Sequence, residues 1–137
     1  MKKWIFSTLL YLSVFVTVPT AAQHENKHID AVKIEFLTKK LDLSPEEAQK
    51  FWPVYHNYQR EMISIFKERR RARQLQKEAN TPPDELKFET RILETKKRYR
   101  KEFQDVLPAQ KADLVFPAER EFREWLINQL RERRQHP

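Results

Sequence analysis

The chain has 137 residues, a net charge of +7, no glycine and no cysteine. A chain of this length supports a single domain. The lack of glycine excludes the phosphate-binding loops of P-loop and dinucleotide-binding proteins, because their close backbone approach to phosphate needs a residue without a side chain. The lack of cysteine excludes disulfides and a lipid on a leading cysteine, so the fold has to be stabilised by packing.

Residues 1–22 differ from the rest of the chain. Lys2 and Lys3 precede an apolar run, and small residues follow it as far as Ala22. This order is typical of a secretory signal peptide. An uncleaved membrane anchor is the alternative, but a span needs about 20 apolar residues and this run has about 15. We expect cleavage after Ala22, which leaves a domain of residues 23–137 with a net charge of +5.

Export predicts a periplasmic protein. Genomic DNA is not accessible in that compartment, so we expect no nucleic-acid partner despite the positive charge. Within residues 23–137, apolar residues recur three and four positions apart. That spacing predicts an all-helical fold, which we divide into four helices. The first is expected over residues 28–40, with one apolar side formed by Ile29, Val32, Phe36 and Leu37.

The second helix begins at a strong local signal. Ser44 can cap the free backbone N–H groups, Pro45 suits the first helical position, and Glu47 completes a capping box. The helix is expected to end near Ala79, and at 1.5 Å per residue it would be about 50 Å long, too long for a compact globule of this size. Its apolar face contains Ala48, Phe51, Trp52, Tyr55, Tyr58, Met62, Ile65 and Phe66.

The third and fourth helices are separated by Leu107 and Pro108. The third follows Asp84, and its apolar residues are Phe88, Ile92, Tyr99, Phe103 and Val106. The fourth is expected to reach Arg134, with Leu114, Ala118, Phe122, Trp125, Leu126 and Leu130 facing inward.

An internal repeat relates the second and fourth helices. A shift of 64 residues aligns residues 43–70 with 107–134 and places Pro53 on Pro117, each directly after an aromatic residue. A proline inside a helix removes a hydrogen bond and costs about 3 kcal/mol or bends the helix. Its recurrence at equivalent positions predicts two bent helical hairpins in an elongated, curved molecule.

These features resemble the Spy/CpxP family of periplasmic chaperones and stress regulators, whose members carry two LTxxQ motifs at helix starts. The first copy, from Leu43 to Gln49, has Ser44 in place of threonine, and the second, from Leu107 to Gln110, lacks the capping residue. The resemblance covers nearly all of residues 23–137. The structural motif residues are Leu43, Ser44, Pro45, Glu47, Gln49, Phe51, Trp52, Pro53, Leu107, Gln110 and Pro117.

The resemblance implies a cradle-shaped antiparallel homodimer that binds unfolded or misfolded envelope proteins without ATP. It also leaves a second function open, because some relatives are stress sensors. In that alternative the protein is a periplasmic regulator that binds a membrane signalling protein, and a metal is one signal to which it could respond.

Two groups of residues are candidates for client binding. Met62, Ile65 and Phe66, together with Ile63, widen the apolar arc beyond what one neighbouring helix can cover, so we expect them to be exposed. Basic residues could attract acidic client segments, although a solvated helix surface is the alternative for each. They are Arg69, Arg70, Arg73, Lys97 and Arg100. The aromatic residues of the second helix, from Phe51 to Tyr58, are expected in the core.

Metal binding and catalysis have little support. His24 and His28 are four residues apart with Glu25 beside them, a spacing that could place two imidazoles and a carboxylate on one helical turn. The segment lies at the expected new N-terminus, where fraying opposes a stable site. No serine, cysteine or histidine lies in a recognisable nucleophile arrangement. We therefore expect neither a functional metal site nor a cofactor, and no enzymatic activity.

Overall fold

A computed structural model describes residues 21–80, 82 and 84–135, and it contains four α-helices and no strand over those residues. The all-helical prediction with four helices is therefore confirmed. The helices are α1 (Ala21–Lys40), α2 (Pro45–Glu78), α3 (Glu85–Val106) and α4 (Ala109–Gln135). None of these helices is long and apolar enough to span a membrane. The predicted signal peptide lies outside the described residues except for Ala21 and Ala22, the first two residues of α1.

The helix ends follow the local signals in the sequence. The Ser44 hydroxyl accepts a hydrogen bond from the Glu47 backbone N–H at 3.1 Å, and the Glu47 carboxylate accepts one from the Ser44 N–H at 2.9 Å. The predicted capping box at the start of α2 is thus present. Asp84 caps α3 with a single bond of this kind, its side chain accepting from the Lys87 N–H at 3.2 Å.

The turns between helices are formed without glycine. Asp42 and Asn80 adopt the left-handed backbone region, with φ of 48° and 52°. These two residue types tolerate that region best after glycine, because their short polar side chains can hydrogen-bond locally.

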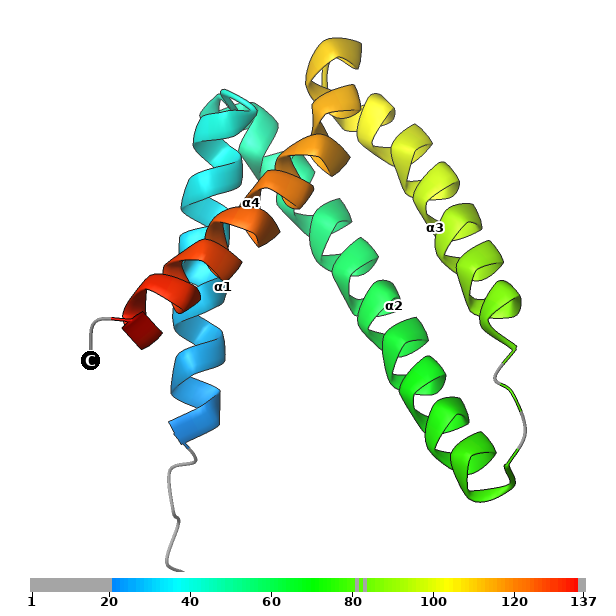
Figure 1. Cartoon of the computed structure of the whole chain (residues 1–137). Helices are drawn as coiled ribbons and strands as arrows, with labels where there is room; N and C mark the ends of the chain where they lie inside the picture. The colour runs from blue at the N-terminus through cyan, green and yellow to red at the C-terminus, as the bar shows by residue number, and fades with distance from the viewer. Residues whose placement is uncertain (1–20, 81, 83, 136–137) are drawn as a thin grey trace, which may run out of the picture.

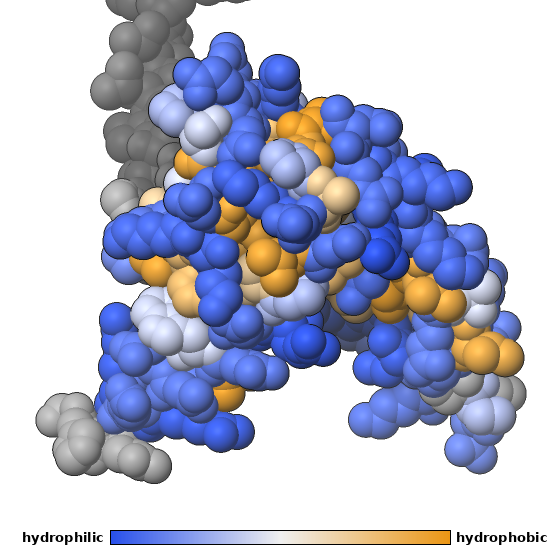
Figure 2. Space-filling view, turned by 90° about the horizontal axis from the view of Figure 1, so that it is seen from above, coloured by the Kyte–Doolittle hydropathy of each residue, from blue (hydrophilic) through white to orange (hydrophobic). Residues whose placement is uncertain are grey.

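The helices form an arch rather than a closed bundle (Figure 1). The helices α2 and α3 make an antiparallel hairpin, which is one arm. From the end of α3, α4 crosses α2 and packs against α1, and these two helices form the other arm. Seen from above, the end of α4 and the tip of the hairpin are two lobes separated by a recess, and hydrophobic side chains occur in patches between polar ones (Figure 2).

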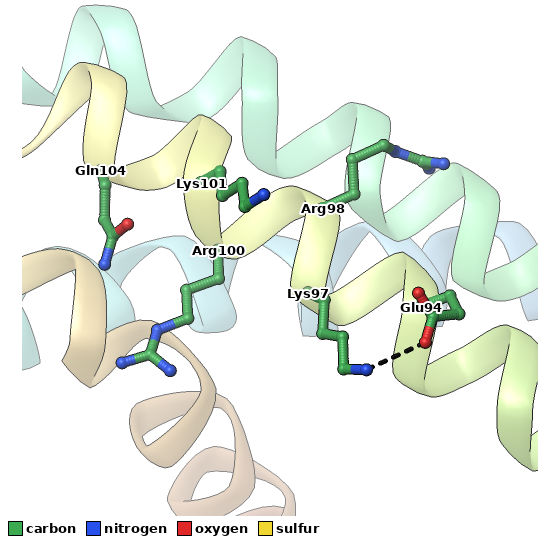
Figure 3. Close-up of a pocket in the computed structure, with 6 residues that line it drawn as sticks. All are labelled: Glu94, Lys97, Arg98, Arg100, Lys101 and Gln104. Atoms are coloured by element: carbon green, nitrogen blue, oxygen red, sulfur yellow. Dashed lines mark hydrogen bonds and ion pairs between the residues drawn. The ribbon is translucent and has the colours of Figure 1, made fainter.

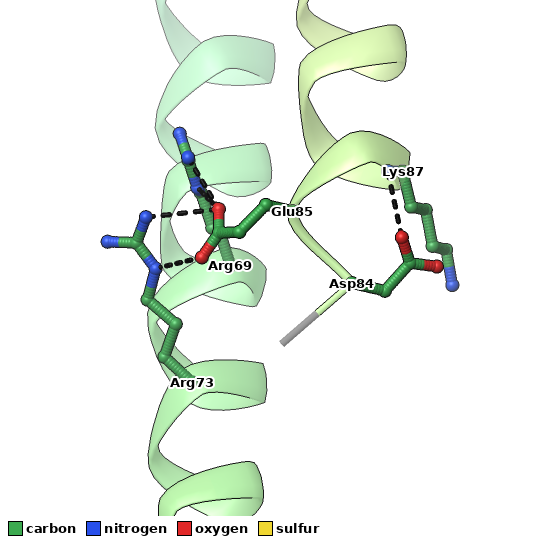
Figure 4. A network of polar contacts seen from close by, with 5 residues as sticks. All are labelled: Arg69, Arg73, Asp84, Glu85 and Lys87. Carbon is green, nitrogen blue, oxygen red and sulfur yellow. Dashed lines mark hydrogen bonds and ion pairs between the residues drawn. The ribbon is translucent and has the colours of Figure 1, made fainter. Parts of the chain in front are cut away.

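Ion pairs join α2 to α3 along the hairpin. At the tip, the Glu85 carboxylate is held by Arg69 at 2.5 Å and by Arg73 at 2.6 Å (Figure 4). Glu68 pairs with Arg91 at 2.5 Å, and Arg98 pairs with Glu61 nearer the closed end of the arch. In contrast, the one ion pair between described side chains of α1 and α4 joins Lys40 to Glu121 at 2.7 Å.

The core lies where the arms meet. Phe51, Tyr55, Tyr58 and Phe103 are fully buried, and their ring centroids lie 5.4–6.4 Å apart where they contact. Burial of each ring contributes about 1.5–3 kcal/mol. The predicted aromatic core is confirmed, with Trp52 half-buried at its edge.

Two contacts join residues that are 64 positions apart. The Lys111 ammonium lies 2.7 Å from the Glu47 carboxylate, and the Tyr55 hydroxyl donates to Glu119 at 3.1 Å. These are equivalent residues of the internal repeat. Contacts between equivalent residues are what an approximate two-fold axis through the crossing of α2 and α4 produces, so we describe the two repeats as related by a pseudo-two-fold axis.

The same symmetry relates α1 to α3 with a shift of 66 residues. Both helices end with a buried leucine whose N–H bonds to the carbonyl four residues earlier: Leu41 to Leu37 and Leu107 to Phe103, each at 2.9 Å. The shift exceeds 64 because the turn after Leu41 has two more residues than the turn after Leu107. Each arm therefore combines one helix from each repeat, α1 with α4 and α3 with α2.

Three features differ from or extend the sequence prediction. Helix α1 begins at Ala21 rather than His28, because residues 21–27 are mostly good helix formers. Leu114, Trp125 and Leu130 of α4 are exposed rather than inward, by 49%, 39% and 43%; at Leu114 this is because Ala112 and Val115 occupy the buried face of the helix. Pro53 and Pro117 lie inside continuous helices on either side of the pseudo-two-fold axis.

Candidate functional site

A groove of about 250 Å³ lies beneath the arch, between the two arms. Helices α1, α2 and α4 all contribute to it. Its lining residues are Ile29, Lys33, Gln59, Met62, Ile63, Phe66, Glu119, Phe122, Arg123 and Leu126. Ile63 is 51% exposed and Phe66 is 44% exposed, so the α2 wall presents large apolar side chains to solvent. A surface of this kind can bind an apolar segment of another chain.

A buried polar junction forms the closed end of the groove. Glu119 of α4 accepts hydrogen bonds from the Tyr55 and Tyr58 hydroxyls of α2, both at 3.1 Å. Burial raises the pKa of both tyrosines far above the usual value, and the Glu119 charge raises each pKa further. The hydroxyls therefore stay neutral donors, and the junction holds α2 and α4 at a fixed crossing.

Cationic side chains flank the apolar wall. Lys33 lies over the Phe122 ring with its ammonium 5.6 Å from the centroid, and Arg123 lies 3.8 Å from Glu119. A second hollow of about 210 Å³ between α2, α3 and α4 shares Phe66 and Arg123 with the groove and adds Lys96. The site thus combines apolar surface with positive charge, which suits a segment that is apolar and acidic.

Of the predicted client-binding residues, Phe66 is exposed in the groove, but Met62 and Ile65 are buried. The prediction that these two are exposed is wrong. Met62 is 7% exposed and Ile65 2%, because they face α3 and join the core that includes Phe88 and Tyr99. Met62 still contributes to the groove wall from beneath.

The basic residues separate into two groups. Arg69 and Arg73 hold Glu85, so they fasten the hairpin and are not available to a client. Arg70 is exposed and forms no ion pair with the described side chains. It lies one turn beyond Phe66 on α2, where it can extend the cationic border of the groove.

Lys97 and Arg100 lie on the outer face of α3, away from the groove. They line an open surface hollow with Glu94, Arg98, Lys101 and Gln104 (Figure 3). Acidic neighbours compensate much of this charge: Lys97 pairs with Glu94 at 3.0 Å and Arg100 with Asp113 at 2.8 Å. Their role is therefore separate from that of the groove residues.

The motif residues lie around the crossing of α2 and α4. Phe51 and Leu107 are buried, Leu43 and Trp52 pack against the core, and Pro117 is half-buried. Ser44, Pro45 and Glu47 form the start of α2. Pro53, Gln49 and Gln110 are exposed. These residues position the walls of the groove, and sequence reasoning missed those that line its other side, Ile29, Lys33, Glu119, Arg123 and Leu126.

No cluster of three metal-ligating side chains occurs within the described part of the chain. His28 is exposed on α1, and the side chains of His24 and Glu25 are not described. A scan of protein-family models, a search of curated proteins and a search of solved structures each found no match to this chain.

Proposed function

We propose that this protein is a periplasmic, ATP-independent chaperone of the Spy/CpxP type that shelters unfolded or misfolded envelope proteins. One observation carries the proposal: Ile63 and Phe66 remain about half exposed in a groove bordered by Lys33 and Arg123. A protein without a partner for this surface would be expected to bury or replace such residues. The predicted secretory leader and the resemblance to that family support a periplasmic location.

Binding in this proposal has two physical stages. Positive charge attracts acidic segments over a range set by ionic strength and raises the encounter rate. Apolar contacts then determine how long the client stays, and covering one side chain such as Phe66 contributes about 1.5–3 kcal/mol. Because each contact is modest, several clients or segments can exchange without nucleotide hydrolysis. No catalytic step is needed.

Aggregation of a reduced model client, with and without the protein, tests this activity. We expect suppression by the parent and a large loss of suppression in the double variant Ile63→Ser with Phe66→Ser. Leu75→Ser with Leu86→Ser is the matched control, because both leucines are exposed outside the groove. Equal suppression by the two double variants, or none by the parent at several-fold excess, would refute the proposal.

A regulator that binds one membrane signalling protein predicts a different result. In a pull-down from envelope extracts, the chaperone should recover a broad mixture of proteins. Recovery of a single stoichiometric membrane protein would favour the regulator and count against the chaperone.

We infer further that the protein is a homodimer. Ile34 and Ile127 are exposed outside the groove, and a second copy would cover apolar surface of this kind. Light scattering after size exclusion of residues 23–137 should give twice the mass of one chain. A monomer at working concentrations would contradict the inference.

A further inference from the structure

A second apolar groove lies between α1 and α4, on the arm opposite the hairpin. Its lining residues are His28, Ile29, Val32, Phe122, Trp125, Leu126, Gln129, Leu130 and Arg133. Trp125 and Leu130 are 39% and 43% exposed, although they face this groove. The void measures about 90 Å³, which corresponds to about three water molecules or three methylene groups. The groove is open to solvent along Trp125 and Leu130, so a longer hydrocarbon chain would lie partly in the void and partly along these side chains.

In the hairpin of α2 and α3, the position equivalent to this groove is filled by polar side chains. The shift of 64 residues aligns Trp125 of α4 with Glu61 of α2. The shift of 66 residues aligns Val32 and Ile29 of α1 with Arg98 and Thr95 of α3. In the hairpin, Glu61 pairs with Arg98 and accepts a hydrogen bond from the Thr95 hydroxyl at 3.3 Å. This polar contact seals α2 against α3. In the arm of α1 and α4 the equivalent side chains are apolar, and a groove remains between the helices.

The symmetry also indicates what Arg133 can bind. Arg133 corresponds to Arg69, whose guanidinium holds the Glu85 carboxylate at 2.5 Å (Figure 4). By the same shift, the position equivalent to Glu85 is residue 19, which belongs to the expected leader and lies outside the described residues. Arg133 forms no ion pair with the side chains that the structure describes. Among the described side chains, Arg133 thus has no carboxylate partner of the kind that Glu85 provides for Arg69.

We propose that this groove binds an anionic amphiphile, a linear acyl chain that ends in a carboxylate. The polar residues of the groove, His28, Gln129 and Arg133, lie at its outer end, towards the first residues of α1 and the last of α4. Val32 and Phe122 lie at the inner end. The head group therefore bonds to Arg133 in the way that Glu85 bonds to Arg69, and the chain lies along Trp125 with its end towards Phe122.

The two grooves share Ile29, Phe122 and Leu126. The acyl-chain site does not depend on the chaperone proposal, since Arg133 and Trp125 lie outside the groove beneath the arch and the α2 wall is not part of it. Equilibrium dialysis of the full protein with labelled decanoate, below its micelle concentration, is the direct test. We expect saturable binding of one decanoate per chain. Arg133→Gln should weaken that binding about tenfold, because a charge-assisted hydrogen bond is lost. The matched control Arg131→Gln changes the same charge outside the groove and should leave the affinity unchanged.

A second variant tests the groove itself. Val32→Arg together with Trp125→Glu transplants the Arg98 and Glu61 pair from the hairpin, which should close the groove and abolish binding while circular dichroism shows the parent helix content. Decanol should bind about tenfold more weakly than decanoate, and decyltrimethylammonium should not compete. The proposal is overturned if decanoate does not bind up to millimolar concentration, if the two arginine variants bind alike, or if an acidic peptide without an acyl chain competes equally.

Discussion

Glu119 is the residue on which the crossing of α2 and α4 depends most. It accepts hydrogen bonds from two buried tyrosine hydroxyls of α2, and one of the donors, Tyr55, is its own equivalent in the internal repeat. A carboxylate can accept both bonds at once because it has two oxygens. Loss of it would leave both hydroxyls buried without an acceptor, which is the costly way to break a hydrogen bond.

Glu119→Leu is therefore expected to lower the free energy of unfolding by about 2–4 kcal/mol. Glu119→Gln should cost less, since the amide oxygen can still accept from one tyrosine. Urea unfolding followed by circular dichroism measures both. Glu124→Leu, on the exposed side of α4, should change stability by no more than about 0.5 kcal/mol. If Glu119→Leu is no more destabilising than Glu124→Leu, the junction does not stabilise the crossing.

Glu85 predicts how the hairpin tip responds to pH. The hydrogen bond from Arg73 is the largest effect on its carboxyl, and together with the hydrogen bond from Arg69 and the charges of both arginines it outweighs desolvation and lowers the pKa from the ordinary 4.5 to about 2. Because the folded-state pKa is the lower one, the stabilisation is complete above about pH 4.5 and is lost as pH falls through about 2.

The difference in unfolding free energy between the parent and Glu85→Gln should therefore be constant above pH 5 and shrink between about pH 4.5 and 2. Chemical denaturation at several pH values measures it. Glu89→Gln, an exposed carboxylate of the same helix, serves as the control and should give a small difference throughout. A difference for Glu85→Gln that does not change with pH would show that the arginine contacts are not formed in solution.

At the scale of the elements, the two arms are fastened unequally. Four ion-pair contacts join α2 to α3, whereas a single one, at the C-terminal end of α1, joins described side chains of α1 and α4. Leu37 is the one fully buried side chain described within α1. Local opening is easiest where few apolar contacts hold an element, so α1 should open before the hairpin does.

Amide hydrogen exchange followed by mass spectrometry tests this difference. Peptides from residues 28–36 should exchange at least about tenfold faster than peptides from the middle of α2, at a pH where exchange is limited by opening. Decanoate should slow exchange in α1 if it occupies the groove between α1 and α4. Equal protection of the two helices would contradict the unequal fastening of the arms.

Helix positions could be predicted from the sequence because their signals are local. The capping box at Ser44, the break at Leu107 and the spacing of apolar residues all act within a few positions, and three of the four helices begin close to the predicted residue. The predicted start of α1 at residue 28 is too late, because the regular helix already begins at Ala21.

The side chains of the groove could not be predicted in the same way. Whether Met62 is exposed depends on where α3 lies, and the Tyr55 contact with Glu119 spans 64 residues. Local periodicity carries no information on such contacts. One signal in the sequence could have located the crossing. The repeat aligns Glu47 with Lys111 and Tyr55 with Glu119, and the two members of each pair are complementary in charge or hydrogen bonding, so they could contact each other across a two-fold axis.

At the scale of the whole molecule, the shape arises because each helix packs against a helix of the other repeat, α2 against α3 and α1 against α4. Because α4 leaves α3 and packs on α1, the arms diverge, and the closed bundle that would hide Ile63 and Phe66 does not form (Figure 1). The concavity thus arises from the crossing of α2 and α4, and bends at Pro53 and Pro117 remain a prediction. An open arch of this kind is the physical basis of the proposed client binding.

Site-specific photocrosslinking to an unfolded client tests that claim most directly. A photoreactive phenylalanine analogue is placed at Ile63 or Phe66 beneath the arch, and at Leu86 on the exposed tip of the hairpin as the control. The account predicts strong crosslinks from both groove positions that disappear when the client is folded, and weak ones from Leu86. Crosslinks of equal strength from Leu86 and the groove, or none from the groove, would contradict it.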